Sequence, residues 1–280
     1  MRMFHVLFLF LILWPLAAAQ EGDPRALGHT TFEQVSATGL VPPDLSAGDP
    51  KELALPGGAK MAMRWIPPGS FMMGSPSSEA NRGNIENQVS VRLNRGFWMA
   101  ETEVTQAQWR SVMGTDPSHF KGDTLPVENV SWNDAVEFCR KLSSSTGLSV
   151  SLPTEAQWEY ACRAGTTTRF HSGDSDGDLG MVGWFITNAG SKTNPVGQKA
   201  ANAWGLRDMH GNVREWCLDR SGGSLPGGTD PTGPSAGSGR VLRGGSLYGS
   251  AQECRSARRG GNDPSYRSYF IGFRPVLTVQ

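Results

Sequence analysis

The sequence predicts an α+β fold that is rich in loops, because of its composition and because few segments have a helical pattern. Of 280 residues, 35 are glycine and 18 are proline, while charged residues make up 19%. This composition is typical of many turns and short irregular connections rather than of a helical bundle. We therefore expect a few helices packed around small, twisted antiparallel strands, with little regular secondary structure.

Three segments have the start and stop signals of helices. Residues 105–114 and 131–147 each begin at a hydroxyl residue suited to the N-cap and stop at a glycine. A shorter helix is expected over residues 154–162, which follow a proline and carry a glutamate in the first turn. Before these helices, MAMRWIPPGSFMMGS alternates apolar and small residues, which predicts short strands broken by a turn.

The charge balance argues against one class of partner. Twenty-six basic residues match twenty-six acidic ones, so the chain has no general attraction to nucleic acid or to an anionic membrane. Hydrophobic residues make up 38% of the chain and include nine tryptophans, enough for a sizeable core. We expect a folded domain with no nucleic-acid partner.

The N-terminus has the pattern of a secretory signal peptide. MRMFHVLFLFLILWPLAAAQ places a basic residue before an apolar run and small residues at the end, which predicts cleavage after Ala19. The run ends at Pro15, short of the roughly 20 residues that span a membrane. We expect a signal peptide over 1–19, a linker or N-terminal arm over 20–55 and the folded domain over 56–280. The mature protein would then be secreted or periplasmic, with no stable membrane anchor.

Export favours disulfide bonds between cysteines. The chain has four cysteines, for which three complete pairings are possible: Cys139, Cys162, Cys217 and Cys254. None of them forms a C-x-x-C pair, so a zinc ribbon or a thioredoxin-type site is not expected.

Seven motifs follow one another along residues 60–275: IPPGSFMMGS, ETEVTQAQW, PVENVSWNDAVEFCRKLS, LPTEAQWEYACRAG, NAWGLRDMHGNVREWCLD, RVLRGGS and IGFR. In this order they resemble the sulfatase-modifying factor family, which comprises the formylglycine-generating enzymes and their relatives. The resemblance implies a loop-rich, formylglycine-generating enzyme-like domain of the C-type lectin superfold, with structural calcium.

The resemblance also implies which residues bind that calcium. The matching positions in DMHGNVREW are Asp208, Gly211, Val213 and Glu215, which offer two carboxylates and backbone carbonyls to a cation that takes roughly six to eight oxygen ligands. The alternative is that Asp208 caps a turn and Glu215 pairs with an arginine. HSGDSDGDLG at 171–180 lacks the glycine and glutamate of a calcium loop and is interpreted as a solvated acidic loop.

Oxidase members of the family bind copper through two cysteines, three and eight residues after the serine of RGGS. Here that serine is Ser246, and Gly249 stands three residues on. Because glycine offers no ligand, the two-cysteine copper site is not expected, and no residue pattern supports iron either. Ser246 and Cys254 remain as catalytic candidates. Aligned from the C-terminal side, Cys254 instead matches a structural cysteine, which implies a Cys162–Cys254 disulfide.

A further set of residues flanks the groove that the family implies: Tyr248, Tyr266, Arg267 and Tyr269. These side chains are suited to holding an extended peptide or a sugar ring, although they could also simply cover the edge of the core. Two classes of function follow. One is an oxidoreductase-like enzyme acting on exported peptides or proteins, including a true formylglycine-generating oxidase; the other is a non-catalytic peptide- or glycan-binding module.

Overall fold

The computed structural model describes residues 45–279. The predicted signal peptide and most of the predicted arm lie outside the described residues. Within residues 45–279, no helix is long and apolar enough to cross a membrane. The folded part begins earlier than the predicted boundary at residue 56, because residues 50–54 form an edge strand that buries Leu53.

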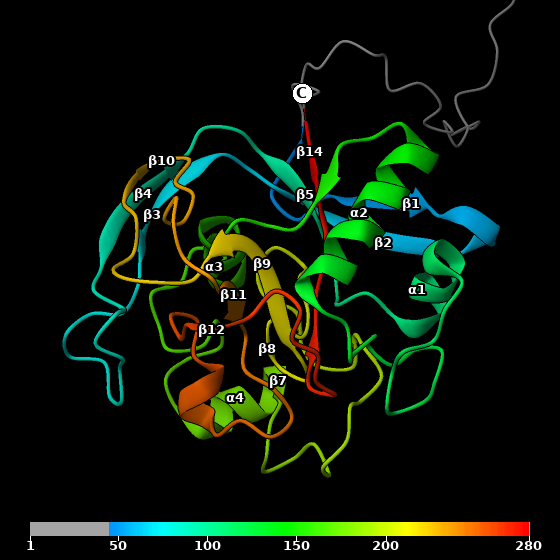
Figure 1. The fold of residues 1–280 in the computed structure, drawn as a ribbon. Helices are drawn as coiled ribbons and strands as arrows, with labels where there is room; N and C mark the ends of the chain where they lie inside the picture. Colours follow the sequence, from blue (N-terminus) through cyan, green and yellow to red (C-terminus); the bar gives the residue numbers. More distant parts are fainter. Residues whose placement is uncertain (1–44, 280) are drawn as a thin grey trace, which may run out of the picture. The chain divides into compact units, whose positions relative to one another are not determined.

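Helices and strands are short and are separated by long irregular segments (Figure 1). The strands are β1 (Pro50–Ala54), β2 (Lys60–Ile66), β3 (Gly69–Met73), β4 (Val89–Leu93), β5 (Phe97–Ala100), β6 (Val150–Ser151), β7 (Gly183–Trp184), β8 (His210–Gly211), β9 (Arg214–Arg220), β10 (Gly228–Thr229), β11 (Arg240–Arg243), β12 (Gly260–Asn262), β13 (Ile271–Gly272) and β14 (Val276–Thr278). The helices are α1 (Gln106–Met113), α2 (Trp132–Thr146), α3 (Glu155–Arg163), α4 (Asp176–Val182) and the 3₁₀ turns η1 (Pro56–Gly58) and η2 (Ala251–Cys254). The predicted α+β class is confirmed.

The three predicted helices form, and their first turns explain why. Thr105, Ser131 and Thr154 each accept a hydrogen bond from the backbone N–H three residues on, and the side chain at that position bonds back to the cap. Such a capping box satisfies two donors that the helix itself leaves free. The first two helices end at Gly114 and Gly147, both in the left-handed conformation that glycine adopts without strain.

The acidic segment interpreted as a solvated loop instead contains α4. Ser175 caps this helix through the backbone N–H of Asp178, and the carboxylate of Asp178 bonds back to Ser175. The helix buries Leu179 and Val182 against η2, and in Figure 1 α4 and η2 lie side by side. Burial of these two side chains stabilises a helix that contains two glycines.

The strands form four small sheets, and sequence-distant segments are neighbours in them. The largest has the order β1-β2-β5-β14-β6, so the last strand of the domain pairs between β5 and β6. A second sheet has the order β12-β11-β9-β13, in which β13 runs parallel to β9. The others are β10-β4-β3 and β7-β8. Of the predicted site residues, Gly211 lies on β8 and Glu215 on β9.

Aromatic side chains fill the space between the sheets and helices. Trp65, Trp158 and Trp216 are at most 1% exposed, and Trp109 stacks on Phe138 with ring centroids 5.7 Å apart. Burial of side chains this large supplies much of the hydrophobic stabilisation of a domain with so little regular structure.

Candidate functional site

The carboxylate of Glu215, on β9, pairs with a buried arginine. The guanidinium of Arg274 donates from Nε and Nη2 to the two carboxylate oxygens of Glu215, both at 2.7 Å. Trp158 also donates to Glu215, from Nε1 at 2.8 Å. All three side chains are at most 1% exposed. This is the arginine pairing considered as the alternative to calcium ligation, and it occupies both carboxylate oxygens.

Two further carboxylates are buried beside this pair without full hydrogen bonding. Within residues 45–279, both oxygens of Glu103 and the Oδ1 atom of Asp208 have no hydrogen-bond partner, while Oδ2 of Asp208 accepts from the backbone N–H of Gly197 at 2.6 Å. Burial, with the neighbouring Asp208, raises the pKa of Glu103 well above its usual value. Burial likewise raises the pKa of Asp208 to about 6. The charge of Arg274 acts on all three carboxylates, and that of Arg207 acts on Asp208 as well.

Unpaired oxygens of this kind fit the calcium ion that the family resemblance implies. A buried carboxylate is stable when it is protonated or when a cation neutralises it. Asp208 and Glu215 belong to the predicted ligand set, and Glu103 adds a third carboxylate that the sequence did not single out. The backbone also fits, because a Cβ at Gly211 would lie 2.0 Å from the carbonyl oxygen of Trp184, so only glycine can make this turn.

The side chains alone do not make a complete metal site. In residues 45–279, no group of three or more His, Cys, Asp or Glu side chains is spaced to hold a metal ion. A calcium ion would therefore depend on Asp208, Glu103 and backbone carbonyls such as those of Gly211 and Val213. Neither of these carbonyls accepts a hydrogen bond from a side chain within the described residues.

The two catalytic candidates are sealed from solvent. Ser246 is 3% exposed, and its carbonyl accepts from the backbone N–H of Gly249 at 2.8 Å. Cys254 has no exposed surface, and burial raises its pKa to about 12. A thiol with that pKa stays protonated near neutral pH, whereas nucleophilic attack requires the thiolate. This geometry argues against a catalytic Cys254.

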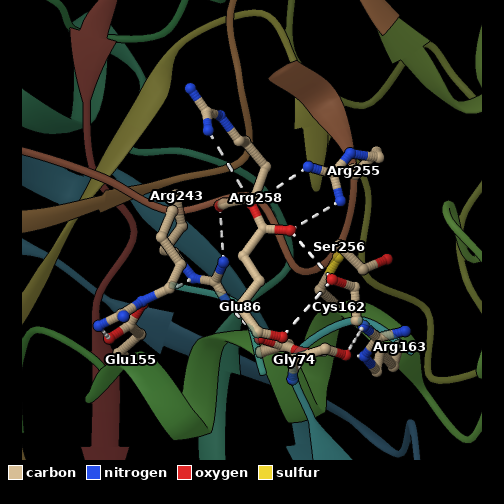
Figure 2. A network of polar contacts seen from close by, with 12 residues as sticks. Gly74, Glu86, Glu155, Cys162, Arg163, Arg243, Arg255, Ser256 and Arg258 are labelled. Atoms are coloured by element: carbon tan, nitrogen blue, oxygen red, sulfur yellow. Dashed lines mark hydrogen bonds and ion pairs between the residues drawn. The ribbon is translucent and has the colours of Figure 1, made fainter. Parts of the chain in front are cut away.

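The arginines near Cys254 do not activate it, because glutamates hold them (Figure 2). Arg255 donates to the two oxygens of Glu86 at 2.9 and 3.1 Å, and Arg258 lies 3.9 Å from the same carboxylate. Arg259 donates to the two oxygens of Glu155 at 2.6 and 2.8 Å. The arginine cluster is therefore part of a structural ion-pair network.

The predicted Cys162–Cys254 disulfide is not formed. All four cysteines are free and buried. The side chain of His210 lies next to both residues of the predicted pair: its Nε2 is 3.7 Å from Sγ of Cys162, and its Nδ1 donates to the carbonyl of Cys254 at 2.7 Å. Burial keeps the pKa of His210 well below its usual value. The neutral imidazole thus links the two segments that the disulfide would have joined.

Next to position 249, five rings form a continuous cluster that we call the aromatic surface: His119, Phe120, Tyr248, Tyr269 and Phe270. Tyr248 and Tyr269 have centroids 5.7 Å apart, and Tyr269 lies 5.4 Å from His119. The two tyrosines are 38% and 42% exposed. These two predicted groove residues lie side by side, and Tyr269 also packs against His119, which is far away in the sequence.

The other two predicted groove residues are arranged differently. Arg267 donates to both oxygens of Asp134, at the start of α2, at 2.8 and 2.9 Å. Tyr266 is 41% exposed and makes no ring contact with the aromatic surface. Phe120 and His119, by contrast, were missed, because their loop between α1 and α2 shows no pattern that would place it beside residues 248–270.

A buried carboxylate beneath the aromatic surface gives a pH-dependent prediction. Glu128 accepts from the backbone N–H of Phe120 at 2.8 Å, while its Oε2 is unpaired, and burial raises its pKa to about 7. Because the pKa of Glu128 is higher in the folded than in the unfolded state, the protonated carboxyl stabilises the protein at pH values below the unfolded-state pKa. This stabilisation is lost as the pH rises through 7. We expect Glu128→Gln to be more stable than the wild type at pH 8 by about 1–2 kcal/mol, after allowance for screening, but not at pH 4.5.

The measurement is the free energy of unfolding by urea at both pH values. Glu52→Gln, on the edge strand β1 with a side chain that is 59% exposed, is the matched control and should leave the difference between pH values unchanged. Equal free energies of unfolding for wild type and Glu128→Gln at pH 8 would show that the charged carboxylate of Glu128 does not destabilise the folded protein.

The fold and these motifs define a class of protein. The chain matches the sulfatase-modifying factor enzyme 1-like domain over residues 53–279, and it belongs to that family. Mouse formylglycine-generating enzyme is 32% identical over 214 residues, which cover 69% of this chain and 55% of the relative. Chaperone protein LppX of Paenibacillus barcinonensis is 34% identical over 173 residues, covering 44% of this chain and 62% of the relative. The chain thus spans little more than half the length of these curated relatives.

Solved structures confirm the fold. Treponema denticola variable protein 1 superposes with a TM-score of 0.76 at 32% identity, covering 81% of this chain and 98% of that one. PvdO from Pseudomonas aeruginosa superposes with a TM-score of 0.75 at 25% identity, covering 84% and 99%. Proteins with different names therefore share this scaffold.

Proposed function

We propose that this chain is an exported peptide-binding module that uses the formylglycine-generating enzyme-like scaffold without copper-dependent oxidation. One observation carries the proposal: the exposed aromatic surface adjoins position 249, where the chain has glycine, while the nearby thiol of Cys254 is fully buried. The groove that the family resemblance implies thus keeps groups that bind but lacks groups that react.

We expect no oxidase chemistry because of the metal ligands that this chain offers at the position of the copper site. Copper in its reduced state prefers soft thiolate ligands. Gly249 supplies none, and the Cys254 thiol is held protonated by burial. Its Sγ atom packs against the backbone of Gly245, where an added Cβ would lie 2.5 Å away. Exposing Cys254 to a substrate would require the RGGS turn to open.

An apolar side chain extends the binding surface on the other side of position 249. The backbone N–H of Ile186 donates to the carbonyl of Gly249 at 3.1 Å, and the Ile186 side chain is 59% exposed. The backbone contact thus brings an exposed aliphatic residue next to Gly249, which follows Tyr248. Such a surface suits an extended chain with apolar side chains.

The packing of the rings favours a peptide over a sugar. Tyr248 and Tyr269 meet at 86°, and Tyr269 and Phe270 meet at 84°, so the edge of one ring covers the face of another. A sugar stacks on an open, flat ring face, whereas peptide side chains also pack well against edges and the spaces between rings. Glycan binding without peptide binding would contradict this part of the proposal.

A peptide with the sequence pattern Cys-x-Pro-x-Arg tests the absence of oxidation. We expect the protein, incubated with copper, oxygen and this peptide, to produce no change of thiol to aldehyde by mass spectrometry. Conversion with turnover would overturn the proposal, because it would show that a catalytic site exists despite Gly249 and the buried Cys254.

Binding is tested with an immobilised library of extended peptides. The double variant Tyr248→Ala/Tyr269→Ala is expected to lose at least about tenfold in affinity for peptides that the wild type retains. Tyr266→Ala is the matched control, because this tyrosine is equally exposed but lies outside the aromatic surface. If Tyr266→Ala weakens binding as much as the double variant does, or if no peptide is retained, the assigned surface is wrong.

A further inference from the structure

A cavity of about 420 Å³ lies beside the aromatic surface. It is lined by the loop 120–125, which follows α1, and by the loop 192–195. The two loops are joined where the backbone N–H of Val196 donates to the carbonyl of Thr124 at 3.0 Å.

The aromatic surface borders this cavity on both sides. Phe120 lines the cavity and packs edge-on against Tyr269, with centroids 6.3 Å apart. Tyr248 donates from its hydroxyl to the carbonyl of Ser191 at 3.2 Å, next to the second loop. A peptide on the aromatic surface would therefore have this cavity within reach.

The wall of the cavity contains a polar group with no partner. Thr193 is 2% exposed, and its hydroxyl makes no hydrogen bond within the described residues. Buried hydroxyl groups are normally satisfied, so an unpaired one beside a cavity points to a partner that is reached by a small movement of the loop 192–195. A hydroxyl of this kind can donate to an anionic oxygen.

The cavity also has positive charge at its rim. Its nine lining residues include two lysines and no carboxylate. Lys192 is exposed and has no ionic partner in the described part of the chain, whereas Lys121 pairs with Asp116 at 3.0 Å. Of the other nearby acids, Asp123 is paired with Arg110, and Glu128 is buried and accepts from the backbone N–H of Phe120. The ammonium group of Lys192 is therefore available to an anion.

We propose that this cavity binds a carboxylate of the peptide held on the aromatic surface, an inference that rests on the proposed function. Lys192 and the hydroxyl of Thr193 bind the carboxylate, and the apolar side chains of Phe120, Leu125 and Pro195 receive the side chain next to it. A carboxylate suits the site because ion-assisted hydrogen bonds are stronger than neutral ones. The chain-terminal carboxylate and an aspartate side chain share this chemistry, and the experiment distinguishes them.

The experiment compares three matched peptides by NMR titration. The first is acetyl-Ala-Gly-Ala-Phe with a free C-terminal carboxylate, the second is its C-terminal amide, and the third is the amide of acetyl-Ala-Gly-Asp-Phe. We expect the free acid, the Asp-containing amide or both to bind at least about fivefold more tightly than the neutral amide. Whichever of the two gains affinity identifies the source of the carboxylate.

Variants separate this site from the aromatic surface. Lys192→Gln and Thr193→Val are each expected to remove most of the preference for the carboxylate and to leave binding of the neutral amide unchanged. Lys141→Gln, on α2 and outside the cavity lining, is the matched control and should keep the full preference. Lys192 is exposed, so its replacement tests the site without disturbing the fold.

Two outcomes would overturn the inference, and they are distinguishable. Equal binding of all three peptides would leave the proposed peptide-binding function standing and reject the carboxylate site. Absence of binding for every peptide, together with no retention from the peptide library, would reject both. A preference that survives in Lys192→Gln and Thr193→Val would place the carboxylate elsewhere.

Discussion

Replacement of Arg274 by methionine is expected to lower the free energy of unfolding by about 3–5 kcal/mol. The guanidinium is fully buried, donates twice to Glu215 and faces the unpaired carboxylates of Glu103 and Asp208. Methionine preserves much of the side-chain volume but leaves the buried carboxylate of Glu215 without its arginine partner. Removing one member of a buried ion pair is costly because the remaining charge cannot be solvated. The measurement is chemical unfolding followed by tryptophan fluorescence.

The matched control is Arg267→Met. Arg267 also makes a bidentate pair, with Asp134, but it is half exposed. Because exposed pairs contribute little, the expected loss is below about 1 kcal/mol. Similar losses for both variants would mean that burial does not determine the strength of the Arg274 pair.

Calcium is expected to stabilise the protein strongly, and removal of Glu103 is expected to cancel the effect. A ligand at a hundred times its dissociation constant adds about 2.7 kcal/mol to the free energy of unfolding. We expect a chelator to lower the midpoint of thermal unfolding of the wild type by several degrees, and readdition of calcium to restore it. In Glu103→Gln, which lacks one buried carboxylate beside Asp208, calcium should change the midpoint little.

The same variant distinguishes a cation from a proton. If Glu103 is a calcium ligand, Glu103→Gln is less stable than the wild type in calcium. If the carboxyl is instead simply kept protonated by burial, the glutamine variant is at least as stable and calcium has no effect on either protein. Glu137→Gln, an exposed change on α2, controls for loss of surface charge. No response of the wild type to calcium or chelator contradicts the calcium assignment.

The three longer helices could be predicted because their signals are local. Each capping box joins residues three positions apart, so the sequence contains both partners within one turn. The edge strand β1 was assigned to the arm, since PKELA shows little alternation and its pairing with β2 becomes evident only in the sheet. The helix α4 was missed because its stabilisation comes from burial against η2, which is a tertiary contact.

The sites were predicted in part, for the same physical reason. Tyr248 and Tyr269 were singled out by residue type, but their partners His119 and Phe120 come from another loop. The predicted Cys162–Cys254 disulfide is not formed in the structure. Alignment with a family shows which segments are neighbours, but it does not show which side chain lies between them, and here that side chain is His210.

The sequence by itself determined the family, the α+β class and the absence of the paired copper cysteines, because motif order and a glycine at position 249 can be identified without coordinates. Only the tertiary structure decided that Cys254 is sealed, that Glu103 joins Asp208 beside Arg274, and that the aromatic surface borders a lysine-rimmed cavity. Burial and pKa depend on which distant segments pack together, and those contacts are long-range.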